Sequence, residues 1–284
     1  MKILVTGAKG LLGTNLVPIL ISSGHEVMAT DIEELDITDT DKVMATVAAE
    51  RPEVIINCAA YTQVDRAEEE KDLAFLINGF GVQNLALASS TYDVILVHLS
   101  TDYVFNGEKS TAYTPFDIPE PINTYGWSKL RGEECLQQIG SRYFLLRTSW
   151  LYGRGGANFV DSILRLASSQ KVIKVVTDQR GSPTWAVNLA NFINRIISSH
   201  KYGLYHVSDE TYGGITWFDF AQEIVKLAGL STEVIPITSE EFPRPAARPK
   251  NSVLDLSWTK IAFDLNFPDW RESLRNYFKE KGLV

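Results

Sequence analysis

Over the first 150 residues, short apolar runs alternate with longer stretches of helical periodicity. Strand-like runs lie at 3–6, 26–30, 54–57, 94–99 and 143–147, and helical spacing of apolar residues marks 11–23, 41–51, 72–90 and 125–139. This alternation is typical of strands that pair in parallel, with helices on both faces of the sheet. The pattern therefore predicts an α/β fold built on a doubly wound parallel sheet.

The pattern becomes less regular from about residue 153 onward. Glycine and proline become frequent, and the proline-rich run 243–249 has the composition of a long loop. We expect a smaller, mixed α/β lobe in this part of the chain. The predicted division assigns 1–152, with a returning segment near 184–205, to the sheet domain, and 153–183 together with 206–284 to the second lobe.

Composition narrows the class of protein. Of 284 residues, 45% are hydrophobic and 22% charged, which suffices for a full core without disulfides. The net charge of −8 has the wrong sign for general binding of nucleic acid. Cys58 and Cys135 form neither a CxxC pair nor a zinc motif, which favours a reducing compartment. No stretch approaches 18 apolar residues, so we expect a cytoplasmic protein with no membrane partner.

The first chemical signal is a glycine-rich turn between the first strand and the first helix. Gly7, Gly10 and Gly13 are spaced three apart, and Asp31 follows the second strand. Glycines let a backbone approach a pyrophosphate, the helix N-terminus attracts it, and an acidic residue at this distance binds a ribose hydroxyl. The turn predicts a Rossmann-type dinucleotide site, although Asp31 could instead be a solvated strand-end charge. Asp31 would repel a 2′-phosphate and Lys9 would attract one, so NADPH and NADH are both plausible cofactors.

The second signal is Tyr125 and Lys129, four residues apart and therefore on one face of a helix. A free tyrosine has a pKa near 10, and a neighbouring ammonium is expected to bring the pKa of Tyr125 toward neutrality. Alone, such a pair is as consistent with a helix surface as with catalysis. Thr101 and Asp102 favour catalysis, because they follow a strand at the carboxyl edge of a parallel sheet, where ligands bind.

The motifs together resemble the extended short-chain dehydrogenases/reductases, and within them the dTDP-4-dehydrorhamnose reductase group. The resemblance covers nearly the whole chain. It is carried by TGAKGLLG at the start, LDITD at 35–39, NCAAYTQVDRAE at 57–68, STDYVFNG at 100–107, YGWSK at 125–129, RTSWLYG at 147–153, DQRGSPT at 178–184 and RPKNS at 248–252. The first and fifth motifs mark the superfamily, whereas STDYVF, RTSW and DQRGSPT are narrower.

The resemblance implies a role for each matched position. Thr101, Tyr125 and Lys129 would form the catalytic set, and Tyr125 and Lys129 would also touch the cofactor. The remaining cofactor residues would be Gly7, Lys9, Gly10, Leu11, Leu12, Gly13, Asp31, Asp36, Ile37, Ala59, Ala60 and Tyr61. Thr101 and Asp102 would also contact the substrate, with Thr62, Val64, Tyr103, Trp150, Arg248 and Asn251. Two of these have plain alternatives: Trp150 as a core residue and Arg248 as an exposed loop charge.

One departure from the family concerns a metal. Some relatives bridge a dimer through a metal held by glutamates, and the matching positions here are Asn15 and Val187. Neither supplies the carboxylate that a hard cation such as magnesium favours. We therefore expect no metal, and either a monomer or a homodimer without a metal bridge.

The resemblance implies that NAD(P)H reduces the C4 ketone of dTDP-4-dehydro-L-rhamnose to dTDP-L-rhamnose, with Tyr125 as the proton donor. One alternative is a nucleotide-sugar dehydratase or epimerase that recycles a bound NAD. A dehydratase carries an Asp-Glu pair after the threonine, whereas Asp102 is followed by Tyr103. A second alternative is a noncatalytic dinucleotide-binding regulatory subunit, although this chain retains all three catalytic residues.

The proline-rich loop suggests how the substrate is recognised. Pro245 and Pro249 restrict the backbone around Arg248, so we expect its guanidinium to be presented to a ligand rather than packed. A diphosphate matches a planar fork of donors. Arg248 is therefore our candidate for the diphosphate of the dTDP-sugar.

Overall fold

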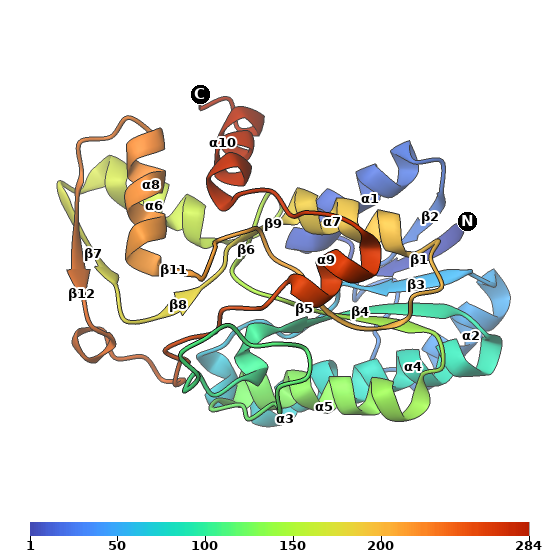
Figure 1. Ribbon diagram of the computed structural model, residues 1–284. Coiled ribbons are helices and arrows are strands. Elements are labelled where there is room, and N and C mark those ends of the chain that lie inside the picture. Colours follow the sequence, from blue (N-terminus) through green and yellow to red (C-terminus); the bar gives the residue numbers. More distant parts are fainter. Residues whose placement is uncertain (284) are drawn as a thin grey trace.

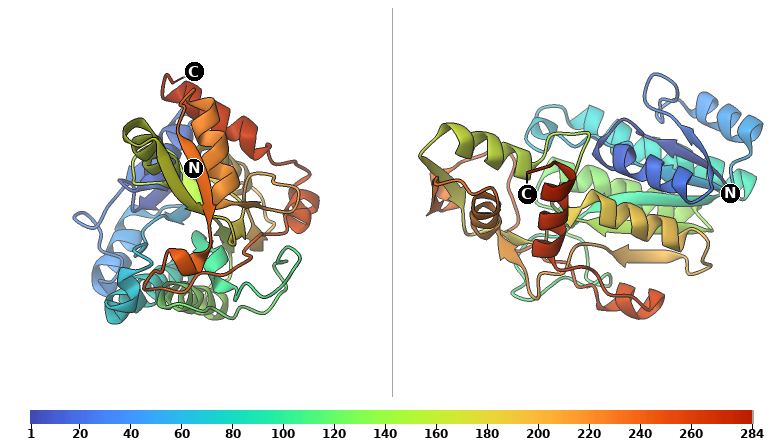
Figure 2. Two further views of the ribbon diagram at one scale, coloured as in Figure 1. Left: turned by 90° about the vertical axis from the view of Figure 1, so that its left-hand side faces the viewer. Right: turned by 90° about the horizontal axis from the view of Figure 1, so that it is seen from above.

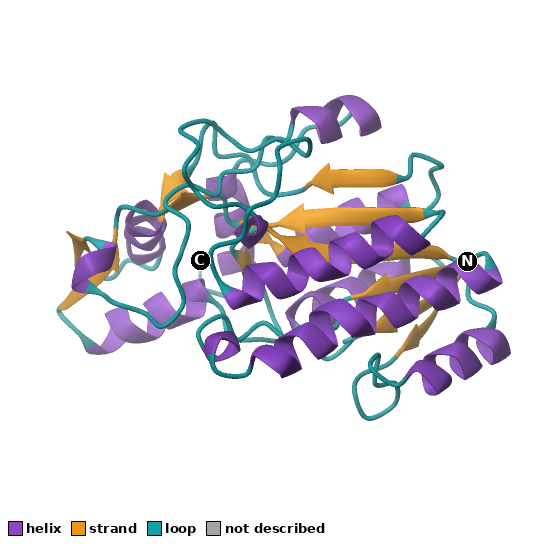
Figure 3. Cartoon of the chain, turned by 90° about the horizontal axis from the view of Figure 1, so that it is seen from below, coloured by secondary structure: helices purple, strands orange, loops and turns teal. Residues whose placement is uncertain are grey.

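The larger lobe is built on a six-stranded, wholly parallel sheet in the order β10-β5-β4-β3-β1-β2. This description comes from a computed structural model, which describes residues 1–283. The strands are β1 (Lys2–Thr6), β2 (Glu26–Ala29), β3 (Val54–Asn57), β4 (Ile95–Thr101), β5 (Tyr143–Thr148) and β10 (Gly203–His206). The predicted doubly wound α/β class is confirmed, and the carboxyl ends of the strands point toward the smaller lobe (Figures 1 and 3).

Helices cover both faces of this sheet because its strands are apolar on both sides. One face packs against α1 (Leu11–Ser22) and α7 (Ala186–Ile196), as the view from above in Figure 2 shows. The other face packs against α2 (Thr40–Glu50), α4 (Gly81–Tyr92) and α5 (Thr124–Ile139). Leu4 and Val5 illustrate the alternation: adjacent residues of β1, they lie in the cores on opposite faces.

The expected helix at 72–90 is interrupted. It consists of α3 (Lys71–Phe75), a π-helical segment η2 (Leu76–Phe80) and α4. By length and composition alone the run Lys71–Tyr92 could cross a membrane, but 56% of its apolar window is buried inside the protein. Such burial is typical of a core helix, and Val82 and Leu85 indeed pack beneath the sheet.

The smaller lobe is mixed α/β, as expected. Its elements are β6 (Leu151–Tyr152), α6 (Phe159–Ser169), β7 (Val172–Val176), β8 (Arg180–Gly181), β9 (Thr184–Trp185), β11 (Ile215–Thr216), α8 (Trp217–Leu227), β12 (Glu233–Ile237) and α10 (Trp270–Glu280). Strand β12 pairs with β7 in parallel, and an aromatic core that includes Tyr152, Phe220 and Trp270 fills the space between α6, α8 and α10.

Four short elements lie in the segments between the strands and helices named above: η1 (Arg66–Glu68), η3 (Asp102–Val104), η4 (Ser239–Glu241) and α9 (Ser257–Phe263). Helix α9 lies beside β10, and Leu256, Phe263 and Phe267 pack into the core of the larger lobe. We therefore propose that residues 256–267 join the larger lobe, in contrast to the division predicted from the sequence.

Candidate functional site

Two adjoining cavities lie along the carboxyl ends of the strands. One, of about 420 Å³, is lined by the glycine turn, by Asp31 and by residues 35–37. The other, of about 410 Å³, reaches from the start of α1 to Thr101, Tyr125, Lys129 and Trp150. Gly10, Cys58 and Ala60 line both, so the cavities form one continuous trough across the end of the sheet.

The glycine turn has the shape of a pyrophosphate cradle. Gly7 has a left-handed backbone (φ +66°), and a Cβ there would come within 2.5 Å of the Ala59 nitrogen. A Cβ on Gly13 would come equally close to the backbone of Ala8, so both positions require glycine for close packing. No side chain caps the N-terminus of α1 at Gly10, which leaves its first N–H groups available to an anion. These residues fit a dinucleotide.

An acidic rim borders the first cavity. The Asp31 carboxylate accepts hydrogen bonds from the backbone N–H of Lys9 (2.9 Å) and of Ile32 (2.9 Å), which fixes it beside the turn. The Lys9 ammonium is paired with Glu33 (3.0 Å) and Glu34 (3.3 Å). A 2′-phosphate would therefore compete with two carboxylates for Lys9.

The second cavity holds the predicted catalytic residues together. Thr101 ends β4, and its hydroxyl donates to Asp102 Oδ1 (3.1 Å) and accepts from the backbone N–H of Tyr103 (3.1 Å). Asn123 caps α5 by accepting from Gly126 N (2.7 Å), so Tyr125 and Lys129 stand on the first turns of that helix, on the face toward the sheet. The Lys129 ammonium donates to the Leu99 carbonyl (2.6 Å). A hydroxyl, a phenol and an ammonium thus meet where sequence analysis expects them.

The expected lowering of the Tyr125 pKa is wrong for the protein alone. Burial, together with the Asp102 charge, raises the pKa of Tyr125 to about 12, and the nearby Thr101 hydroxyl only partly opposes this. Burial also lowers the pKa of Lys129 to about 8, although the Glu133 carboxylate opposes this. The reason is desolvation, which disfavours the charged form of each group and outweighs the attraction assumed between them.

Asp102 is a further titratable group in this cavity. Burial raises the pKa of its carboxyl to about 7, while the nearby hydroxyls of Ser252 and Thr101 oppose the shift. Near neutral pH Asp102 is therefore present in both its neutral and its charged form.

The π-helical segment η2 positions the loop between the two cavities. The Asn78 amide accepts from Tyr61 N (2.9 Å) and donates to Tyr61 O (3.0 Å) and Ser128 Oγ (2.9 Å). This ties residues 59–62 to α5. Sequence analysis missed Asn78, because a one-residue irregularity inside a helix leaves no trace in the apolar periodicity.

Trp150 is held in an unusual conformation at the cavity wall. Its backbone is left-handed (φ +46°), which is rare for a bulky residue. Its indole stacks on Trp217 with centroids 3.4 Å apart, and a Cβ at Gly181 would come within 2.5 Å of it. The glycine of the DQRGSPT motif thus makes room for the indole, which partly lines the cavity.

The expectation that Arg248 presents its guanidinium to a ligand instead of packing it is wrong for the protein alone. The Arg248 side chain is only 16% exposed, and its guanidinium donates to Asp65 Oδ1 (2.6 Å) and to Ala246 O (2.6 Å). Asp65 also accepts from Arg244, whose Nε lies 2.9 Å from Oδ2. These contacts hold the pKa of Asp65 at about 2 despite its partial burial and fasten the proline-rich loop to the larger lobe.

Most predicted site residues line the trough, but six do not. Gly13, Tyr61, Val64, Tyr103, Arg248 and Asn251 are absent from both linings. The Tyr61 hydroxyl donates to Glu70 (2.6 Å), and the Asn251 amide donates to the carbonyls of Lys109 (2.7 Å) and Thr111 (2.9 Å). Tyr103 lies just beyond the trough, with its ring 5.9 Å from that of Tyr125.

The structure also adds residues that the sequence analysis did not select. Cys58, Ser100, Thr148, Ser149, Ala157 and Leu189 line the second cavity. Thr148 ends β5 and Ser149 follows it, both in the RTSW motif, so their position at a strand end was the available signal. Burial raises the pKa of the Cys58 thiol to about 12, which makes it a poor nucleophile.

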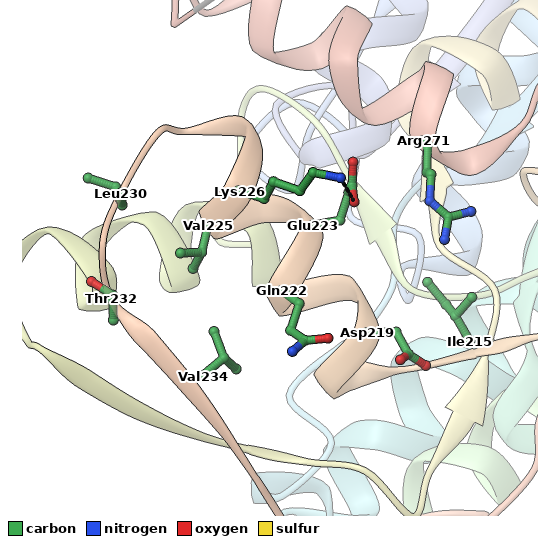
Figure 4. Close-up of a pocket in the computed structure, with 10 residues that line it drawn as sticks. All are labelled: Ile215, Asp219, Gln222, Glu223, Val225, Lys226, Leu230, Thr232, Val234 and Arg271. Carbon is green, nitrogen blue, oxygen red and sulfur yellow. Dashed lines mark ion pairs between the residues drawn. The ribbon is translucent and has the colours of Figure 1, made fainter.

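A larger cavity, of about 650 Å³, lies on the smaller lobe, between α8, β12 and the start of α10 (Figure 4). Its polar lining includes Glu223, which is paired with Lys226 (3.6 Å), and Arg271 from α10. None of the predicted site residues borders it. This cavity is larger than either of the two that form the trough, but the predicted site residues gather along the trough.

Asn15, at one of the two positions where some relatives hold a metal, makes other contacts in this structure. The Asn15 amide donates to Leu11 O (2.6 Å) and Arg154 O (2.9 Å), and so links α1 to the loop after β6. Within residues 1–283, no group of three His, Cys, Asp or Glu side chains could hold a metal ion. The metal-free state stays a prediction.

Comparison with known proteins gives one consistent answer. The chain is 41% identical to the dTDP-4-dehydrorhamnose reductase of Aggregatibacter actinomycetemcomitans, with 97% of each chain covered. A crystal structure of dTDP-4-dehydrorhamnose reductase from Bacillus anthracis in complex with NADP has a TM-score of 0.95 and 43% identity, over 98% of this chain and 99% of that one. The dTDP-4-keto-6-deoxy-D-glucose reductase of Streptomyces niveus is 39% identical over 88% of this chain and 87% of its own.

The family comparison covers almost the entire chain. Residues 1–282 match the family described as RmlD substrate binding domain. The chain therefore belongs to the RmlD family, a family of NAD(P)-dependent reductases that act at C4 of dTDP-sugars.

Proposed function

We propose that this protein uses NAD(P)H to reduce the C4 ketone of dTDP-4-dehydro-L-rhamnose, which gives dTDP-L-rhamnose. The observation that carries the proposal is the convergence of Thr101, Tyr125 and Lys129 in a cavity continuous with the glycine turn. A ketone placed between a dinucleotide site and a proton donor is the arrangement that carbonyl reduction requires. The family relationship supports the same reaction class.

The cofactor would be held by the first turn of α1, by the glycine turn and by Asp31. A reduced nicotinamide, when bound, supplies the hydride for C4. Tyr125 donates its phenolic proton to the oxygen that becomes the alcohol. Thr101 hydrogen-bonds the same oxygen, and the Lys129 ammonium stabilises the tyrosinate left behind. A Tyr125 pKa of about 12 keeps the phenol fully protonated at neutral pH, as a proton donor must be.

The order of groups leading away from Tyr125 matches the order of groups in a nucleotide sugar. Tyr103 packs edge-on against Tyr125, and the positive charge of Arg248 acts on the Tyr103 phenol, where it partly opposes the rise in pKa that burial causes. Beyond Arg248 lies a cavity of about 260 Å³ that Arg244 and Phe242 help to line. With the sugar at Tyr125, the diphosphate would meet Arg248 and the nucleoside would extend toward Phe242, at the cost of breaking or sharing the contact with Asp65.

A dTDP-linked 4-keto-6-deoxyglucose is the second candidate substrate, because a relative at 39% identity carries that activity in its name. The decisive experiment is a panel of the two dTDP-4-keto sugars with NADPH and with NADH, followed by absorbance at the nicotinamide band and by NMR of the product. Stoichiometric oxidation of cofactor with formation of dTDP-L-rhamnose is expected. Conversion without net cofactor oxidation would indicate a dehydratase or epimerase, and binding without conversion a regulatory subunit.

We also propose that the enzyme is cytoplasmic and works as a monomer or as a homodimer without a metal bridge. Light scattering of the purified protein with magnesium and with EDTA tests the second part. An assembly that dissociates only on chelation would refute it.

A further inference from the structure

A buried ion pair lies one helical turn beyond Lys129. Glu133 on α5 accepts two hydrogen bonds from Arg147 on β5, at 2.9 Å from Nε and 2.6 Å from Nη2. The two side chains are 1% and 2% exposed. Desolvation of such a pair cancels most of its Coulomb attraction, so it contributes little net stability. The pair calls for another explanation, and the proposed reaction does not use it.

The helix and the sheet bring this pair to the catalytic lysine. Tyr125, Lys129 and Glu133 are spaced four apart and share one face of α5. Lys129 donates to the carbonyl of Leu99 on β4, and the next residue of β4, Ser100, pairs directly with Arg147 on β5. Ammonium, carboxylate and guanidinium therefore occupy consecutive positions beneath the cavity floor.

The other titratable groups around them are few. His98 on β4 accepts from Asn57 Nδ2 (3.0 Å), assuming its Nδ1 is unprotonated, and His206 on β10 pairs in register with Arg147. Burial lowers the pKa of both histidines, that of His206 to about 3, so both are neutral at physiological pH. Asp102 faces the cavity at the end of β4. Phe105 covers the guanidinium at 5.1 Å, which excludes water from it.

We propose that Glu133 and Arg147 are positioning residues that together set the charge state of Lys129, and through it the supply of protons by Tyr125. Glu133 favours the ammonium form of a buried lysine, and Arg147 limits that effect by neutralising most of the carboxylate charge. Because the two charges oppose each other, Lys129 stays charged during the reaction. Its ammonium also keeps its hydrogen bond to the Leu99 carbonyl instead of pairing with Glu133. The catalytic part of this inference rests on the proposed reductase function, whereas the effect on Lys129 does not.

Opposite shifts distinguish this role from a structural one. Glu133→Gln removes the anion and leaves Arg147, so the Lys129 pKa should fall by about one to three units. Arg147→Met removes the cation and leaves Glu133, so the Lys129 pKa should rise by a similar amount. The double variant restores a neutral pair and should return close to the wild-type value. Arg147→Lys keeps the charge and should also resemble wild type.

The measurement is a pH titration of the Lys129 side chain by NMR, with ¹³C-labelled lysine and Lys129→Gln to assign the signal, in the full-length protein. The same variants are then assayed as reductases, and the alkaline limb of the pH profile of kcat should move with the Lys129 pKa. The variant Asp102→Asn separates the contribution of Asp102 to that profile. Shifts in the same direction, or none, overturn the proposal. If one single variant fails to fold, the sign of the shift in the other decides: a lower Lys129 pKa in Glu133→Gln, or a higher one in Arg147→Met, supports the proposal, and the reverse sign or no shift overturns it. Shifts of Lys129 without any reductase activity would instead refute the proposed function and leave the pair's effect established.

Discussion

Arg248→Ala tests whether the proline-rich loop binds the diphosphate of the substrate. In this structure the guanidinium is paired with Asp65, so a bound diphosphate has to share or replace that carboxylate. The substitution does not strand Asp65, because Arg244 Nε (2.9 Å) and the Ala246 N–H (3.3 Å) still donate to it. We therefore expect the variant to fold and to change ligand binding more than stability.

The magnitude follows from this competition. A hydrogen bond to a charged group contributes about 1.5–3 kcal/mol. In the free protein Arg248 already gains part of this free energy from its pairing with Asp65. The loss of substrate binding free energy in the variant should therefore lie at the lower end, at about 1.5 kcal/mol. This corresponds to roughly a tenfold rise in KM or in the Kd for dTDP. The Kd for NADPH should not change, because Arg248 lies outside both cavities of the trough.

Calorimetric titration of dTDP and of NADPH into wild type and variant provides the assay. Arg131→Ala is the matched control, since Arg131 is an exposed residue of α5 whose guanidinium pairs with Glu134 (3.1 Å). Weaker NADPH binding with normal dTDP binding would place Arg248 on the cofactor side and refute the assignment. An unchanged affinity for both would show that the guanidinium serves only to fasten the loop through Asp65.

Three further outcomes are expected. Tyr125→Phe should lose at least a hundredfold in kcat while keeping its Kd for NADPH, because only the phenolic proton is removed; kcat near wild type would exclude Tyr125 as the donor. Asp31→Asn keeps an acceptor for the Lys9 N–H but removes a charge from the acidic rim, so the ratio of the KM values for NADPH and NADH should fall; a rise would mean that Asp31 does not face the ribose. The pKa of His206 is about 3 because burial excludes its charged form, so below pH 6.5 the unfolded chain takes up a proton that the native state refuses. Chemical denaturation between pH 6.5 and 5 should show the free energy of unfolding fall by up to about 1.4 kcal/mol per unit more steeply in wild type than in His206→Asn, and equal slopes would contradict this.

Local signals in the sequence determined a large part of this protein. Continuous apolar runs in the strands and the 3.6-residue period of the helices depend only on neighbouring positions, so the strands and helices of the first 150 residues were predictable to within two or three residues. The separation of Tyr125 and Lys129 by one helical turn is local in the same sense. The glycine turn could be assigned from the spacing of Gly7, Gly10 and Gly13 after a strand-like run, and the structure gives the reason: Gly7 and Gly13 meet backbone from adjacent elements, which only glycine allows.

Tertiary structure decided what depends on partners distant in the chain. Asp65 and Arg248 are 183 residues apart, and no periodicity reveals that the loop expected to present Arg248 instead ties it to the larger lobe. The pKa of Tyr125 depends on how completely the folded chain excludes water, a quantity that spacing along a helix cannot give. The pairing of Glu133 with Arg147 follows from the register between β4, β5 and α5. Sequence fixes which groups are adjacent on one element, and packing between elements fixes their charge, their solvation and their partners.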